Sequence, residues 1–137
     1  MPEHKLDKKL IGYFTTIENI TNARVKDIFL LDNHLTVIVH QGEAGKAIGK
    51  KGLMIKRLTR LLNKKIKIIE FSDNPEEFIK HAIDPITIAS IETKENTIII
   101  HPGDNLAKGR IIGRNSKNIT FLNTLTTRYY NKKAIIS

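Results

Sequence analysis

The sequence predicts an α+β fold, an α/β sandwich made of two consecutive copies of one unit, each a three-stranded sheet covered by helices. A β-branched run that ends in glycine occurs twice, at residues 34–42 and 95–103. A glycine-containing segment followed by periodic apolar residues also occurs twice, at 47–62 and 111–126. The chain has 137 residues, of which 40% are hydrophobic, so it can form one ordinary domain or two small ones with packed cores.

The two copies align at an offset that increases along the chain. Gly42 aligns with Gly103 at an offset of 61 residues, and Gly49 aligns with Gly113 at an offset of 64. A third match near the end of each copy raises the offset to 68. The increases fall in loops or at a helix end, where small insertions are tolerated. We therefore interpret the chain as an internal duplication.

Each copy is expected to contain the same elements in the same order: helix, strand, strand, helix, glycine turn, helix and strand. Runs rich in β-branched residues predict the strands, and apolar residues at a spacing of three or four predict the helices. The first domain, residues 1–72, has a predicted helix within 5–21, strands at 24–31, 34–42 and 63–69, and a helix that begins at about Leu53.

The second domain, residues 73–137, begins with a helix that the sequence delimits at both ends. Asn74 can cap this helix, Pro75 suits its first position, and the two glutamates that follow complement the positive end of the helix dipole. The helix is expected to run to about Ala82, because Pro85 stops it. The predicted strands of this domain lie at 86–92, 95–103 and 131–136.

The composition favours a polyanionic partner. Lys and Arg number 23 against 14 Asp and Glu, which gives a formal net charge of +9 at pH 7; the alternative is a basic protein with no specific ligand. The absence of cysteine excludes a disulfide scaffold, a thiol nucleophile and a cysteine-based zinc site. No run approaches the roughly 20 apolar residues of a membrane span, and the polar start of residues 1–9 does not resemble a secretory signal. We expect a cytoplasmic monomer without membrane contact.

Four of the 8 glycines lie within residues 42–52. A Walker A loop is excluded because no glycine there has a second glycine five positions on, followed by lysine and then serine or threonine. A dinucleotide-binding fingerprint is excluded because the glycine spacings are 3, 4 and 3. The remaining interpretation is a pair of short helices joined by Gly49–Gly52, with Gly42 ending the strand and Gly45 permitting close packing of the first helix.

The turn formed by Gly49, Lys50, Lys51 and Gly52 has the features of a phosphate-binding loop. Ile48 is expected to be buried, so that the turn presents bare backbone and two lysines. The helix that follows directs its unpaired N–H groups and its positive dipole end toward the turn. Side chains at the two glycine positions would hold a sugar–phosphate backbone away. The structural alternative is a turn that merely ends a helix.

The predicted helix after the turn separates apolar from basic residues. From residue 46 to residue 67 the chain has nine basic residues and no acidic one. The candidate phosphate contacts beside the turn are Lys46, Lys56, Arg57 and Arg60. The side chains expected to face the core follow helical spacing and are Met54, Ile55, Leu58, Leu61 and Leu62.

This order of elements around a G-x-x-G turn resembles the type II KH domain, a module that binds RNA and single-stranded nucleic acid and whose loop clamps about four nucleotides. The segments GEAGKAIGKKG, NKKIKIIEFSDNPEEFIKHAI and GRIIGRNSKNI resemble the archaeal NusA family, whose short form consists of two KH domains. The resemblance covers about residues 12–136. It implies single-stranded RNA as the ligand, a role in transcription termination or elongation through nascent RNA, and RNA polymerase as a candidate partner.

The corresponding turn of the second copy is Gly113, Arg114, Asn115 and Ser116, so serine stands where the resemblance places a glycine. A serine can cap the next helix and donate its hydroxyl to a phosphate, but its Cβ narrows the approach and disfavours a positive φ. Residues 105–137 nevertheless contain no acidic residue. We expect the first copy to grip RNA and the second to guide it, and the candidate contacts that flank the second turn are Arg110 and Lys117.

No catalytic or metal-binding cluster is predicted. Of the five histidines only His40 and His101 are equivalent, and one histidine per copy supplies neither paired metal ligands nor a nucleophile with its base. Glu43 and Asp104 are interpreted as helix-start residues. The tyrosine pair at 129–130 could stack on bases, although such a pair more often has a member in the core. We predict a protein without enzymatic activity or cofactor.

Two other functions stay open at the level of the sequence. Type II KH domains also occur in ribosomal and ribosome-assembly proteins, so the ligand could be ribosomal RNA. The chain could also be a protein-interaction module that docks on RNA polymerase, although the basic residues around Gly49 argue against this function.

Overall fold

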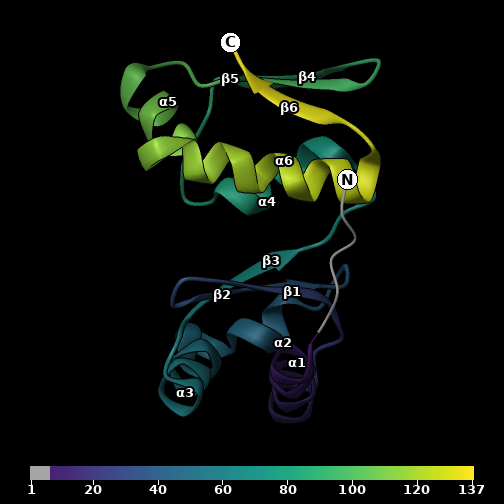
Figure 1. The fold of residues 1–137 in the computed structure, drawn as a ribbon, viewed down its shortest axis with the longest axis vertical. Coiled ribbons are helices and arrows are strands. Elements are labelled where there is room, and N and C mark those ends of the chain that lie inside the picture. The colour runs from purple at the N-terminus through teal and green to yellow at the C-terminus, as the bar shows by residue number, and fades with distance from the viewer. Residues whose placement is uncertain (1–6) are drawn as a thin grey trace. The chain divides into compact units, whose positions relative to one another are not determined.

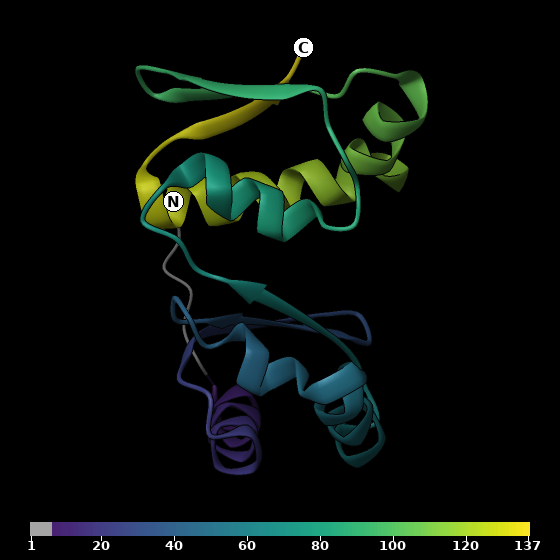
Figure 2. The same ribbon diagram turned by 180° about the vertical axis from the view of Figure 1, so that it is seen from behind.

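The computed structural model of the protein describes residues 7–137. The predictions that concern residues 1–6, which include most of the polar start, lie outside the described residues. The described chain forms two compact units that divide between Ser72 and Asp73. Each unit has a three-stranded sheet with its helices packed on one face (Figure 1 and Figure 2), which confirms the predicted α+β fold. No helix in residues 7–137 is long and apolar enough to cross a membrane.

The first unit consists of α1 (Lys8–Thr21), β1 (Val25–Leu31), β2 (His34–Val39), α2 (Ala44–Ile48), α3 (Leu53–Leu62) and β3 (Lys65–Glu70). The strand β2 pairs antiparallel with β1 and parallel with β3, so Val37 lies between Ile28 and Ile68. A parallel pair needs a crossover connection, and here α2, the glycine turn and α3 form it. The turn is therefore held at a defined place beside the sheet.

The second unit consists of α4 (Pro75–Ile83), β4 (Ser90–Lys94), β5 (Thr97–His101), α5 (Asn105–Ile112), α6 (Lys117–Tyr130) and β6 (Lys133–Ile136). Its sheet repeats the topology of the first, with β5 antiparallel to β4 and parallel to β6. Asn74 caps α4 as predicted, because its side-chain oxygen accepts a hydrogen bond from the N–H of Glu76 at 2.9 Å. The second turn thus lies in the same kind of crossover as the first.

Each unit has its own apolar core between the sheet and the helices. In the first unit Val37 and Val39 of β2 are fully buried together with Ala47 of α2 and Leu58 of α3. Full burial of a branched aliphatic side chain contributes roughly 1.5–3 kcal/mol, so these positions anchor the helices on both sides of the turn. The matching positions of the second core are Ile98, Ile100, Ile111 and Leu122.

The first strand of the second unit begins later than the sequence predicts. The prediction placed it at 86–92, whereas β4 is Ser90–Lys94. Ile86 donates its N–H to the carbonyl oxygen of Ile83 at 2.9 Å, so its backbone completes a turn after α4 and does not pair with a strand. Ile86 and Ile88 still pack against the core. Because both residues are apolar, the sequence pattern included them in the predicted strand, although they only pack against the core.

Three residues between α2 and the end of α3 lie in environments that differ from the predicted ones. Ile48 is 36% exposed, because the buried position of the short helix α2 is taken by Ala47. Leu61 is 58% exposed, because Leu62 packs against the core in the last turn of α3. A Cβ on Gly45 would meet no heavy atom within 4 Å, so close packing does not require this glycine. Ile48 therefore leaves apolar surface exposed beside the turn, and Leu61 does so at the far end of α3.

Candidate nucleic-acid interface

The first turn requires glycine at position 49. Gly49 has φ 76° and ψ 168°, a region of backbone conformation that is essentially restricted to glycine. A Cβ at this position would lie 2.7 Å from the Cβ of Met54 and 2.8 Å from its backbone nitrogen. Gly49 therefore allows the end of α2 to approach the first turn of α3.

Residues 50–52 form a single 3-10 turn between α2 and α3. Lys51, with φ 54° and ψ 28°, and Gly52, with φ 72° and ψ 14°, are both left-handed. The N–H of Gly52 donates to the carbonyl oxygen of Gly49 at 3.1 Å. A Cβ on Gly52 would point into open space, so glycine here serves the backbone conformation and leaves room above the turn.

The basic residues predicted for the first copy lie together on the turn and on α3. Lys50 and Lys51 are exposed on the turn, and Lys56, Arg57 and Arg60 are exposed along α3, as predicted. Among the described residues, no side chain caps the N-terminus of α3. The N–H of Leu53, the first of the helix, donates to the carbonyl oxygen of Lys50. The positive end of the α3 dipole faces the turn, which favours an anion at this place.

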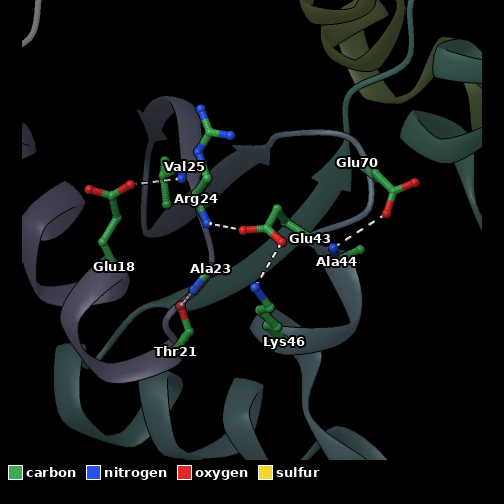
Figure 3. Close-up of polar contacts among 9 residues, drawn as sticks. All are labelled: Glu18, Thr21, Ala23, Arg24, Val25, Glu43, Ala44, Lys46 and Glu70. Carbon is green, nitrogen blue, oxygen red and sulfur yellow. Dashed lines mark hydrogen bonds and ion pairs between the residues drawn. The ribbon is translucent and has the colours of Figure 1, made fainter.

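Lys46, which the sequence also predicts as a phosphate contact, already has an anionic partner. Its Nζ lies 3.1 Å from Oε2 of Glu43. The other carboxylate oxygen of Glu43 accepts a hydrogen bond from the backbone N–H of Arg24 at 2.9 Å (Figure 3). This bond, followed by the bond from Lys46, lowers the pKa of Glu43, whose side chain is only 13% exposed. Lys46 can therefore contact RNA only by sharing or leaving the ion pair.

The same contacts fix the start of α2. Glu43 precedes α2 as predicted, but its side chain holds Arg24 instead of capping its own helix. Glu70, the last residue of β3, accepts a hydrogen bond from the N–H of Ala44 at 3.3 Å. Figure 3 shows that the carboxylates of Glu43 and Glu70 join the start of α2 to the segment before β1 and to the end of β3. The helix that leads into the turn is thereby tied to the sheet.

The second turn has nearly the same backbone as the first although it lacks the fourth glycine. Gly113 has φ 76° and ψ 169°, and Asn115 has φ 55° and ψ 30°. Ser116 has φ 60° and ψ 21°, so a residue with a Cβ occupies the left-handed region. The side chain of Ser116 makes no capping bond to α6, and the predicted capping role is therefore wrong. The exposed basic residues around this turn are Arg110, Arg114 and Lys117.

Asn118 is a residue of this region that the sequence analysis did not identify. Its Nδ2 donates to the carbonyl oxygen of Arg110 at 3.0 Å. A Cβ on Gly113 would lie 2.6 Å from both Cγ and Nδ2 of Asn118. Asn118 thus joins the end of α5 to the start of α6 across the second turn. Because Met54 stands at the matching position of the first copy, a comparison of the two copies is the signal that could have found it.

The two equivalent histidines have different surroundings. His101, at the end of β5, lies between Glu92 and Ser137, with Nε2 3.0 Å from Oε1 of Glu92 and Nδ1 2.8 Å from Oγ of Ser137. The bond from His101, followed by the charge of Lys94, lowers the pKa of Glu92. Burial, followed by neighbouring cationic side chains, lowers the pKa of His40. Within residues 7–137 no group of three His, Cys, Asp or Glu side chains could hold a metal ion.

The tyrosine pair belongs to the packing of the second unit. The rings of Tyr129 and Tyr130 lie edge-on to the ring of Phe78 of α4, at centroid distances of 5.6 Å and 5.7 Å. Phe78 is fully buried. Edge-to-face contacts of this kind stabilise a core, which favours packing over base stacking for these residues.

The fold and the two turns, each entered through a glycine between two helices, are those of tandem KH domains. The family described as KH domain matches residues 11–92. The "Probable transcription termination protein NusA" of Methanococcus vannielii is 34% identical over 121 residues, which cover 84% of this chain and 68% of that protein. The protein of the same name from Halococcus morrhuae is 25% identical over 127 residues, which cover 91% of each chain.

A solved structure has a similar fold over nearly the whole chain. The crystal structure of APE1850 matches with a TM-score of 0.72 and 28% sequence identity, over 93% of this chain and 96% of that chain. The chain belongs to the archaeal NusA family of KH-domain proteins. The resemblance predicted from the sequence is thereby confirmed.

Proposed function

We propose that the protein binds single-stranded RNA in transcription, with the turn Gly49–Gly52 as its principal contact. One observation carries the proposal: two exposed lysines and two glycines form a turn that leads directly into the uncapped start of α3. Unpaired backbone N–H groups at the start of a helix can donate hydrogen bonds to phosphate oxygens, and the lysines add charge attraction. The relatives' names refer to transcription termination and support a role in that process. The proposed ligand is the nascent RNA, and the proposed role includes elongation.

The surroundings of the turn extend the proposed contact. Arg57 and Arg60 continue the basic surface along α3 and can bind further phosphates. Ile48, which is 36% exposed, and Leu53, which is 61% exposed, offer apolar surface to bases on either side of the turn. Bases reach such surface only when they are unpaired and unstacked, so single strands should be preferred over duplexes.

The second turn and the protein partner complete the proposal. Arg110, Arg114 and Lys117 add weaker contacts that guide the strand, while the first turn grips it. The protein acts as a monomer, needs no cofactor for this activity, and contacts RNA polymerase while it holds the transcript.

Fluorescence anisotropy with labelled RNAs tests the principal contact. Wild type is compared with the double variant Lys50→Asp, Lys51→Asp. Because Asp tolerates the left-handed conformation observed at Lys51, the turn should be retained. We expect single strands to bind more tightly than duplexes, with log affinity falling against log salt at about −0.7 per phosphate contact. The variant should bind about 100-fold more weakly, since it loses two charged hydrogen bonds of about 1.5 kcal/mol each.

The matched control is the double variant Lys8→Asp, Lys9→Asp, which changes the net charge equally in the exposed first turn of α1. Acidic residues are favourable at that end of a helix, so the fold should be preserved. The control should lose far less affinity than the turn variant. Equal losses would mean that binding depends on net charge alone, and a turn variant that binds like wild type would exclude Gly49–Gly52 as the site.

A further inference from the structure

We propose that Asn118 is a positioning residue that holds the second turn in its phosphate-binding conformation in place of the missing fourth glycine. The inference rests on the proposed function, because it assigns an RNA-binding role to the turn Gly113–Ser116. It concerns how this turn keeps its shape, and it gives Asn118 no direct contact with RNA.

The two turns have nearly the same backbone conformation. The first residue of each turn has φ 76°, and the third has φ 54° in one turn and 55° in the other. The fourth residue has φ 72° in Gly52 and 60° in Ser116. In both turns the N–H of the fourth residue donates to the carbonyl oxygen of the first at 3.1 Å. The same backbone conformation is therefore reached by two different sequences.

Ser116 does not favour this conformation by itself. A residue with a Cβ is disfavoured in the left-handed region, whereas Asn115 beside it is among the residues that tolerate it. The hydroxyl of Ser116 makes no capping bond that would compensate. Conformations in which Ser116 has a negative φ therefore compete with the observed turn unless another contact opposes them.

Asn118 supplies such a contact. The carbonyl of Arg110 lies in the last turn of α5, where helix carbonyls lack intrahelical partners. Asn118 donates to this carbonyl at 3.0 Å, and its side chain occupies the space that a Cβ on Gly113 would need. The bond spans the turn, so it fixes the distance between its two ends. A turn closed in this way has less freedom to leave the conformation that Ser116 disfavours.

The first copy provides the internal comparison. Met54, at the position that matches Asn118, has no hydrogen-bond donor in its side chain. Gly52, at the position that matches Ser116, adopts the left-handed conformation without a steric penalty. The two differences therefore compensate. The first turn has glycine at its fourth position and no side-chain hydrogen bond from Met54, whereas the second has serine there and the hydrogen bond from Asn118. If only part of the population has the binding conformation, the apparent affinity falls by that fraction.

The test is a double-mutant cycle between Ser116 and Asn118 in the full chain, with Lys50→Asp, Lys51→Asp present so that the second turn dominates binding. Asn118→Met introduces the residue of the first copy. We expect it to speed amide hydrogen exchange at Ser116 and Lys117, and to weaken RNA binding, by about fivefold each, the factor that one ordinary hydrogen bond supplies. With Ser116→Gly also present, Asn118→Met should change both quantities by less than about twofold.

The matched control is Met54→Asn in the otherwise unchanged chain, which should alter affinity by less than about twofold because the glycines already permit the first turn. Unchanged exchange and affinity in Asn118→Met would overturn the proposal, as would equal losses with serine and with glycine at position 116. If Arg114→Asp does not weaken binding in the Lys50→Asp, Lys51→Asp chain, the second turn is not a clamp and the inference fails. The function proposed for the first turn is judged separately by its own variants.

Discussion

Alanine replacement of Gly49, Gly52 and Gly45 will show which glycine of the first turn region the structure requires. Gly49→Ala should be the most damaging change. Its φ of 76° with ψ of 168° is strained for alanine by about 1–3 kcal/mol. The added Cβ would also lie 2.7 Å from the Cβ of Met54, which resembles overpacking at a cost of about 1–3 kcal/mol. Together these terms give a destabilisation of about 2–6 kcal/mol.

The other two glycines should respond differently. Gly52→Ala meets no atom within 4 Å, so only the left-handed φ opposes it. The left-handed φ costs alanine about 1–2 kcal/mol of stability. Alanine also reduces the conformational entropy of the unfolded chain, which restores about 0.4–1 kcal/mol. Gly45→Ala lies within α2 and also meets no atom, so it should stabilise the first unit by about 1 kcal/mol. From most to least stable, the expected order is therefore Gly45→Ala, wild type, Gly52→Ala and Gly49→Ala.

The assay is urea unfolding, monitored through the amide NMR signals of the first unit. Signals from one unit are needed because the two compact units need not unfold in a single transition. Gly45→Ala should also bind RNA like wild type, because it leaves the turn unchanged. A loss below about 1 kcal/mol for Gly49→Ala, or a larger loss for Gly52→Ala than for Gly49→Ala, would refute the steric reasoning.

Ser116→Gly should stabilise the second unit by up to about 1 kcal/mol, because it removes the left-handed cost of serine but adds freedom to the unfolded chain; urea unfolding of that unit measures the change, and destabilisation would contradict it. Because the pKa of Glu43 is lowered in the folded state, its carboxylate stabilises the fold fully at pH values above its ordinary pKa of 4.5. This stabilisation is lost as the pH falls through the lowered pKa. Glu43→Gln should therefore reduce the acid sensitivity of the first unit, measured as urea midpoints at pH 6 and at pH 3, and an unchanged difference between the midpoints would exclude this role. RNA polymerase recovered on the immobilised protein should persist after ribonuclease treatment and in the Lys50→Asp, Lys51→Asp variant; its loss after the treatment would mean that RNA alone bridges the two.

The sequence predicted the features that depend on local chemistry and repetition. The strands around Val37 and Ile98 and the glycine turns follow from residue patterns that occur twice. The sequence did not predict which residue of α2 is buried, because a helix of five residues has too short a pattern and the sheet contact selects Ala47 over Ile48. It also placed the start of β4 too early, because Ile86 and Ile88 pack against the core without strand pairing and look like strand residues in the sequence. Asn118 was missed because its role depends on a carbonyl eight residues earlier in the chain.

The two turns show how one backbone conformation can be specified by different chemistry, with consequences for binding. The first turn relies on glycine freedom and carries two lysines, whose long side chains can adapt to a strand and attract it by charge. The second turn has one arginine between Gly113 and Asn115, and a side-chain bond restrains its ends. A restrained turn loses less entropy on binding but adapts to fewer strand geometries. A turn that captures RNA by charge followed by one that accepts it in a fixed geometry accords with the grip and guide roles proposed for the two copies.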